Sequence, residues 1–362
     1  MARFPWACPW EYVNLSVKTK YNEVMVEHEI KNKVELLNSD GTLKEEGFAR
    51  KPYFLYDRSK IKASKLRIKE WDYYAILDPV EENVICMTFS DLGFAGLFAL
   101  ALIDYKNKRA IQKDQIKFFT MHKTGLIGSP WDDNTIAFSD KKFSFSFTKE
   151  GETRHIVVKS EDINIDSCFF QGESKETINI ATSWKENRRA FYLNEKAVAM
   201  TPISGYVQIK GNRYDVKSNK MTLILDWGRG RWTRENTWYW AAASGFDELN
   251  NAIGFNLGYG FSDRTPASEN AFFLADKLHK IKNVTFNFES HMKEWIMKDD
   301  EGKLNLTFTP VVPRMSKTDL KIIVSDQKQI FGYFDGFVIL EDGTKKEIHH
   351  LMGFAEEVYN KW

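Results

Sequence analysis

The feature that most constrains the fold is a strict alternation of apolar and polar residues that recurs along the chain. In KFSFSFTKE, Phe143, Phe145 and Phe147 alternate with serine and threonine. Since successive side chains of a β-strand point to opposite faces, this spacing predicts a strand with one apolar and one polar face. The same period recurs in ETINIATSW (176–184), NVTFNFES (283–290) and KLNLTFTP (303–310). Many short strands separated by turn signals are typical of antiparallel sandwiches and barrels, so we expect an all-β protein.

Other segments add strands and very few helices. WDYYAILD and NVICMTFSDL are short apolar runs bounded by Asp, Pro and Glu, and the run 94–103 is apolar on every side, which we interpret as a strand because its neighbours are strands. GYFDGFVILEDGTKKEIHHL predicts a hairpin that turns at Asp342-Gly343. The basic segment 59–70 fits either an exposed edge strand or a short helix, and other short helices are expected near 267–278 and 353–361. Strand–helix–strand alternation is missing, which argues against a parallel α/β enzyme.

The length of the chain predicts two domains. At 362 residues it exceeds what one ordinary hydrophobic core organises. The weakly patterned stretch WKENRRAFYLNEKAV (184–198) is the candidate boundary, which gives domains 1–195 and 196–362. We expect each domain to be an antiparallel barrel or a strongly curved sheet, and a barrel of about eight strands can hold one small ligand.

The candidate functional segment is DWGRGRWTRENTWYWAAASG (226–245). Buried charge is costly unless it pairs or meets a polar ligand, so dense charge among indoles predicts a lined pocket. A network of arginines and carboxylates that joins two sheets would explain the same composition, and the residues leave both interpretations open. The predicted ligand-binding residues are Trp227, Arg229, Arg231, Trp232, Arg234, Asn236, Trp238 and Trp240, with Asn256 and Tyr259 from GFNLGYGFSD (254–263).

Asp226 and Glu235 are the predicted catalytic residues. A general acid or base needs a pKa near the working pH, and burial among indoles would raise a carboxyl pKa. The neighbouring arginines would act in the opposite direction, so a purely structural salt bridge is the alternative. The nine residues between the two carboxylates do not fix the distance between them.

Several classes of site are not expected. The charge is nearly balanced, with 51 basic against 50 acidic residues, so nothing points to a nucleic-acid partner, although aromatic and basic residues interleave at 227–240. The seven histidines show no HxH or HExxH spacing, and we expect no metal. Gly254, Gly258 and Gly260 lack the Lys-Ser or Lys-Thr of a phosphate loop, and we expect no nucleotide or other cofactor.

The cysteines and the apolar runs bear on the compartment. Cys8, Cys86 and Cys168 are odd in number and form no CxxC pair, which fits a reducing cytoplasm better than a disulfide framework. Pro5 and Pro9 interrupt the N-terminus where a signal peptide would be apolar. The run 92–103 is shorter than the roughly 20 residues of a membrane span. We therefore expect a cytoplasmic protein without stable membrane insertion, and its oligomeric state stays open.

Six separated blocks of the chain resemble a known family. They are GTLKEEGFARKPYFLYDR, WDYYAILDP, FSDLGFAGLFAL, the 226–245 segment, GFNLGYGFSD with ASENAFF, and GYFDGFVILEDGTKKEIHHLMGFAEEV. Together they resemble the bacterial domain-of-unknown-function family 2804 (DUF2804) over nearly the whole length. That family name implies no activity.

A more distant resemblance carries implications for the fold. An Asp-Trp-Gly followed about ten residues later by Trp-aromatic-Trp is similar to the carotenoid 1,2-hydratase group, which includes AttH-like proteins and some lipocalin-like cyclases. The resemblance implies two lipocalin-like β-barrels side by side with an apolar ligand pocket. It also implies that Asp226 matches the acidic region that protonates a carbon–carbon double bond. The Asp-His-Glu-Trp-Gly form of that group is absent, because Leu225-Asp226 occupies this place.

These observations lead to three functional hypotheses. The first is binding, and acid-assisted hydration, isomerisation or cyclisation, of a hydrophobic small molecule such as an isoprenoid or lipid by Asp226 or Glu235. The second is a glycoside hydrolase that uses the same two carboxylates, with tryptophans stacked on sugar rings. The third is a carrier or interaction protein without catalysis. The sequence leaves open whether the protein is an enzyme.

Overall fold

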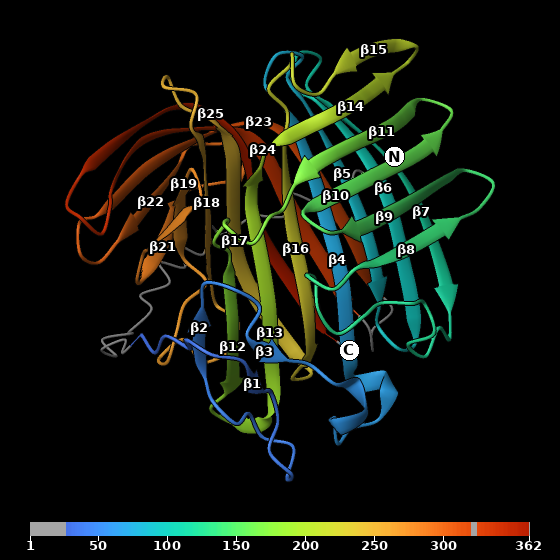
Figure 1. Ribbon diagram of the computed structural model, residues 1–362, viewed down its shortest axis with the longest axis vertical. Helices are drawn as coiled ribbons and strands as arrows, with labels where there is room; N and C mark the ends of the chain where they lie inside the picture. Colours follow the sequence, from blue (N-terminus) through green and yellow to red (C-terminus); the bar gives the residue numbers. More distant parts are fainter. Residues whose placement is uncertain (1–26, 320–323, 362) are drawn as a thin grey trace, which may run out of the picture.

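The computed structural model describes residues 27–319 and 324–361, and it confirms an all-β protein built from curved antiparallel sheets (Figure 1). Cys8 lies outside the described residues. Cys86 and Cys168 are free thiols. No helix in the described part of the chain is long and apolar enough to span a bilayer.

Two sheets form the N-terminal half. The eight-stranded sheet runs in the order β2 (Gly47–Ala49), β12 (Ile178–Trp184), β13 (Asn187–Met200), β16 (Thr222–Arg231), β4 (Ile68–Asp78), β5 (Asn83–Asp91), β6 (Ala95–Asp104) and β7 (Arg109–Phe118). The six-stranded sheet runs in the order β15 (Asn212–Asp215), β14 (Pro202–Ile209), β11 (Ile163–Phe170), β10 (Thr153–Ser160), β9 (Phe143–Glu150) and β8 (Asn134–Ser139). In Figure 1 the six-stranded sheet lies in front of the eight-stranded one. β1 (Val34–Glu35) and β3 (Phe54–Leu55) form a small parallel pair beside them.

One sheet forms the C-terminal half. Its nine strands run in the order β20 (Lys277–Lys280), β19 (Ala271–Leu274), β18 (Ala252–Tyr259), β17 (Glu235–Phe246), β25 (Lys345–Lys361), β24 (Val324–Ile339), β23 (Leu304–Asp319), β22 (Trp295–Asp299) and β21 (Val284–Phe288). The sheet curls until β21 reaches β18, where the backbone N–H of Phe286 donates to the Tyr259 hydroxyl at 3.4 Å. The expected hairpin at Asp342-Gly343 joins β24 to β25 and is confirmed.

The alternating pattern produces three layers of core. Phe145 and Phe147 stack at 4.8 Å and point from β9 into the space between the two N-terminal sheets. Phe255 and Phe334 meet edge to face at 4.8 Å inside the curled nine-stranded sheet. A third cluster fills the contact between the eight-stranded and nine-stranded sheets, and we call this contact the seam. The eight-stranded sheet is therefore covered on both faces, which explains why 94–103 is apolar throughout and forms β6.

Two expected short helices are wrong. Residues 267–278 contain β19 and the start of β20, and residues 353–361 lie within β25. Both segments gain partners from the sheet, since Phe354 pairs across to Ala242 and Phe331, and such pairing overrides a weak local helix preference. In the described residues the helices are two 3-10 turns, η1 (Arg58–Lys60) and η2 (Lys65–Arg67). The ambiguous segment 59–70 therefore contains most of η1, all of η2 and the start of β4.

The place where one half ends can be read from the strand order. The sequence-based boundary after residue 195 falls inside β13, which pairs with β12 on one side and with β16 on the other. The chain passes from the eight-stranded to the nine-stranded sheet between β16 and β17. We therefore propose that the structural division lies at residues 232–234.

Candidate functional site

Strand β16 sends alternate side chains to two different places. Asp226 faces the seam, with Lys196 of β13 and Tyr73 of β4 directly opposite it in the register. Trp227 faces the interior of the N-terminal half, with Glu195 as its opposite on β13. Adjacent residues of the Asp-Trp-Gly motif therefore serve different surroundings.

Asp226 is buried and fully engaged. Its carboxylate accepts hydrogen bonds from Asn194 Nδ2 at 2.6 Å and Trp71 Nε1 at 3.1 Å, and Lys196 Nζ lies 3.0 Å away. The Trp71 indole can reach this carboxylate because it crosses Gly228, where a Cβ would stand 1.9 Å from Trp71 Cζ2. The glycine of the motif is thus required by the position of the indole.

Lys196 connects the two halves across the seam. Its ammonium lies 3.5 Å from Glu269 Oε2 and 4.0 Å from the centroid of the Trp240 ring. Asn256 completes this side of the seam, because it accepts from Trp240 Nε1 at 2.6 Å and donates to Glu269 Oε2 at 3.2 Å. Two carboxylates therefore share one buried ammonium above an indole face.

Glu356 of β25 stands directly opposite Trp240 in the register. Its carboxyl group accepts from Trp238 Nε1 at 3.0 Å and from Gln329 Nε2 at 3.2 Å. Part of the side chain remains accessible, yet the packed groups around the carboxyl exclude most of the water. This burial raises the pKa of Glu356 to about 7; Lys196 opposes the rise, and the negative charge of Asp226 adds to it.

Aromatic rings extend the seam toward a surface pocket. The Phe261 ring lies 4.8 Å from Tyr192, 4.8 Å from Trp232 and 5.3 Å from Trp238. The residues on either side of Phe261 line a pocket of about 450 Å³, together with Trp184, Glu235, Asn236, Thr237, Tyr239, Tyr259, Asp263 and Arg264. Phe261 thus lies between two lining residues of this pocket and contacts the aromatic rings of the seam.

The predicted residues divide among these places. Asp226, Trp238, Trp240 and Asn256 meet in the seam with Trp232 beside them, whereas Glu235, Asn236 and Tyr259 line the surface pocket. Glu235 is exposed and accepts a hydrogen bond from the Tyr359 hydroxyl. It lies five residues from Trp240 on β17, roughly 16 Å along the strand, and strand alternation turns it to the opposite face. The structure does not bring Asp226 and Glu235 together.

The arginines lie away from the seam. Arg229 is buried in the N-terminal half, over the Trp227 ring at 4.1 Å and 3.0 Å from Asp72 Oδ1. Arg231 is half-buried and donates to Lys62 O at 3.4 Å, and Arg234 is exposed. The composition suggested a network of arginine and carboxylate, and such a network lies inside the N-terminal half.

That interior holds a second perturbed acid. Glu195 is buried, and this burial raises its pKa to about 8. The hydroxyl of Thr177 donates a hydrogen bond to the carboxyl group and partly opposes the rise. Nearby Glu70 has a pKa lowered to about 2; burial alone would raise it, but His122, Arg229 and Arg58 reverse the effect. Across the strand pair Glu195 faces Trp227, one of the predicted ligand-binding residues.

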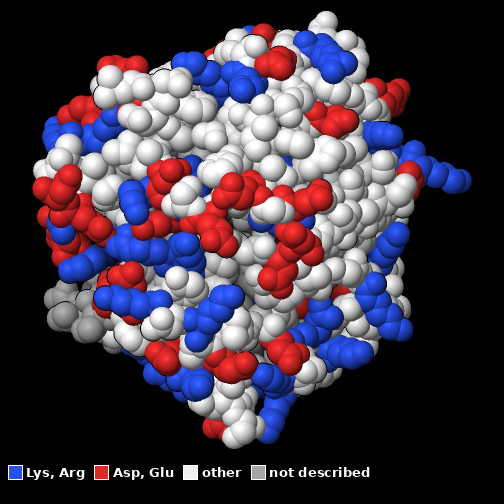
Figure 2. All heavy atoms as spheres, viewed as in Figure 1, with Lys and Arg blue, Asp and Glu red and all other residues white. Residues whose placement is uncertain are grey.

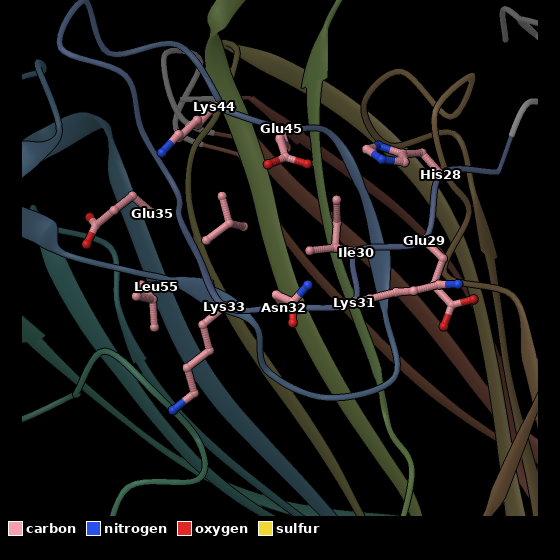
Figure 3. Close-up of a pocket in the computed structure, with 11 residues that line it drawn as sticks. His28, Glu29, Ile30, Lys31, Asn32, Lys33, Glu35, Lys44, Glu45 and Leu55 are labelled. Carbon is pink, nitrogen blue, oxygen red and sulfur yellow. The ribbon is translucent and has the colours of Figure 1, made fainter.

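A further hollow of about 430 Å³ lies along residues 28–35 (Figure 3). Lysine and glutamate side chains surround it, including Lys33, Glu35 and Lys44, and it contains no predicted site residue.

Sequence reasoning missed three charged residues of the seam, Lys196, Glu269 and Glu356. Lys196 belongs to the stretch that was interpreted as a weakly patterned boundary, where Tyr192, Asn194 and Lys196 share a face by two-residue spacing. That spacing was the available signal. Glu269 and Glu356 carry no local signal, because only sheet packing brings them to Lys196 and Trp240.

Comparison with solved structures supports the fold. An AttH-type protein from Nitrosomonas europaea aligns at 12% identity over 83% of this chain and 95% of its own, with a TM-score of 0.50. CghA, solved with Sch210972, aligns at 8% identity over 94% of this chain and 96% of its own, with a TM-score of 0.51. Kievitone hydratase from Nectria haematococca aligns at 11% identity over 94% and 98%, with a TM-score of 0.48. At such identities the likeness concerns the fold alone.

Comparison of sequences adds a family match. Residues 27–362 match the family described as "Domain of unknown function (DUF2804)". No curated protein matches the sequence significantly.

Proposed function

We infer that this chain, which belongs to the DUF2804 family, binds a small organic molecule at the seam and protonates it there. The observation that carries the proposal is the carboxyl group of Glu356, whose pKa of about 7 lies far above the ordinary 4.5 while Trp238 holds it in place. An acid of this kind keeps its proton close to neutral pH and can deliver it to a substrate.

The surroundings suit a reaction in which positive charge develops. Glu356 would give its proton to one carbon of a double bond, which leaves a cation on the other carbon. The indole of Trp238, which lies against the Glu356 carboxyl, would stabilise that cation. Water would then add to it and return a proton to the Glu356 carboxylate, or loss of a neighbouring proton to that carboxylate would give an isomer. The carboxylates of Asp226 and Glu269, which both lie beside the Lys196 ammonium, would favour the same cation.

An apolar or largely apolar substrate fits these surroundings, since the cluster consists mainly of aliphatic residues together with tryptophan, tyrosine and phenylalanine. The glycosidase hypothesis is less well supported, because it needs Asp226 and Glu235 on either side of one bond. A carrier without catalysis would not use the proton that Glu356 retains near pH 7.

The test combines a native ligand with solvent isotopes. Organic extracts of the protein's own host are incubated with the purified protein in D2O, and mass spectrometry follows deuterium that becomes bound to carbon. We expect labelled products with the wild type and with Glu235→Gln, and none with Glu356→Gln. Equal labelling by Glu356→Gln, or loss of labelling only in Glu235→Gln, would sink the proposal. Native mass spectrometry of the same variants shows whether each still folds and binds.

A further inference from the structure

An exposed aromatic turn follows the edge strand β7. Phe118 and Phe119 are 73% and 77% exposed, and Leu66 on η2 is 45% exposed. The two segments are neighbours, because the space above Gly93 is filled by the backbone of Lys65 and Leu66 while Phe119 N donates to Phe94 O at 2.7 Å. Single exposed apolar residues are common, but two adjacent phenylalanines beside a leucine form a patch that calls for a partner.

The turn is held rigidly in an unfavourable backbone conformation. Phe119, Met121 and His122 have φ values of +56°, +51° and +61°, which bulky residues rarely adopt. Such conformations persist when the surrounding structure imposes them, and they gather at functional surfaces.

Buried side chains supply that support. Thr120 and Thr124 donate to the two carboxylate oxygens of Asp91 at 2.7 and 3.0 Å. His122 Nδ1 lies 2.8 Å from Glu70 Oε2, and its Nε2 lies 2.8 Å from Lys65 O. The network therefore fixes the turn to β4, β5 and η2, and it keeps the phenylalanine rings in solvent.

The exposed charges around the rings are mainly basic, whereas the carboxylates of Glu70 and Asp91 are buried beneath the turn. Residues 59–69, 92–98 and 115–127, which meet here, contain lysine and arginine but no aspartate or glutamate. Lys62, Lys65, Lys117 and Lys123 are exposed. In Figure 1 the end of β7 and the two 3-10 turns lie at the lower right, and Figure 2, in the same orientation, shows mainly basic side chains along that edge. The protein as a whole has a net charge of only +1, so this concentration is local.

We propose that this basic–aromatic rim, consisting of Leu66, Phe118, Phe119 and the lysines 62, 65, 117 and 123, docks the protein on an anionic lipid membrane. Lysines attract an anionic bilayer surface, and exposed aromatic and aliphatic side chains enter its interface. The rim is also continuous with the seam, since Arg67 Nη2 donates to Trp232 O at 2.8 Å and Trp232 packs on Trp71 at 5.2 Å. Docking goes beyond the proposed function and does not depend on it.

The test is flotation of the full chain with vesicles at low and high salt. Wild-type protein is expected to float with vesicles of phosphatidylcholine and phosphatidylglycerol in 50 mM NaCl and to remain behind with phosphatidylcholine alone. Phe119→Asn, which introduces a residue that tolerates positive φ, should bind roughly tenfold less or weaker still. Lys65→Gln and Lys123→Gln should each cost roughly fivefold. Binding should fall in 0.5 M NaCl because salt screens the lysines.

Leu249→Asn is the matched control, since Leu249 is 80% exposed between β17 and β18 on the other half of the molecule. It should float like the wild type. Absence of wild-type flotation with anionic vesicles at low salt overturns the proposal, and so does equal loss in Leu249→Asn. If size-exclusion chromatography instead shows a dimer that only Phe119→Asn dissolves, the rim is an interface between two copies and the membrane proposal fails.

Discussion

Replacement of Glu356 by glutamine tests the central electrostatic feature of the seam. The pKa of this carboxyl rises from 4.5 to about 7 on folding, because the packed seam disfavours its charged form. The folded state then holds a proton that the unfolded chain releases above pH 4.5. A raised folded pKa contributes stability that is fully present below pH 4.5 and is lost as the pH rises through 7. The total corresponds to about 3 kcal/mol, an upper bound because the side chain is partly accessible.

The assay is urea unfolding of the wild type and Glu356→Gln at several values between pH 4 and 8.5. Glutamine resembles the protonated acid in shape but cannot ionise. We expect the free energy of unfolding of the wild type to fall relative to the variant by up to about 1.4 kcal/mol per pH unit between pH 4.5 and 7, and then to level off. Comparison within the pair cancels the titration of all other groups.

The neighbouring Glu357 provides a contrast of opposite sign. Its hydrogen bond with His291, aided by Tyr239, lowers its pKa to about 2. Stability from this group is present above pH 4.5 and is lost as the pH falls toward 2, so Glu357→Gln should differ most from the wild type at neutral pH.

A constant difference between the wild type and Glu356→Gln across the whole range would mean that Glu356 is ionised in the folded protein, and the proton-donor role would be refuted.

Three further substitutions probe the seam and the interior of the N-terminal half. Gly228→Ala should destabilise the fold by more than the roughly 1–3 kcal/mol typical of overpacking, because the new Cβ would lie 1.9 Å from Trp71 Cζ2. Denaturant midpoints measure the loss, and an unchanged midpoint would contradict the close approach of Trp71 to Gly228. Glu195→Gln should flatten the pH dependence of unfolding between pH 4.5 and 8, since the wild-type acid gives stability that is lost as the pH rises through 8, and parallel curves would speak against this. Asp226→Asn should lower the free energy of unfolding by about 3–5 kcal/mol, because it leaves Lys196 poorly paired. In a double-mutant cycle, adding Lys196→Met should restore part of this loss. Strict additivity of the two substitutions would show that the groups do not interact.

Much of the fold could be predicted from local patterns. The alternation at 143–147 produced β9, the all-apolar run 94–103 produced a strand covered on both faces, and Asp342-Gly343 produced the last hairpin. The two expected short helices failed because a segment such as 353–361 obtains hydrogen-bond partners from strands that are distant in sequence. Propensity has no information about such partners.

The candidate site could be predicted only in part. Composition singled out 226–245, and Asp226, Trp238 and Trp240 from it do meet in the seam. Glu235 was grouped with Asp226 because it is near in sequence, yet the pleat and the turn between β16 and β17 carry it to another surface. The arginines were grouped for the same reason, and Arg229 points into the N-terminal half instead.

The sequence by itself determined which residues alternate, which segments become strands and which stretch concentrates aromatic rings with charge. Those properties depend on spacing along one strand. The tertiary structure alone decided that Lys196 meets Asp226 and Glu269, and that Glu356 lies under Trp238 with a raised pKa. These side chains come from strands of two sheets, and their pKa values depend on the water that packing removes, which no local pattern encodes.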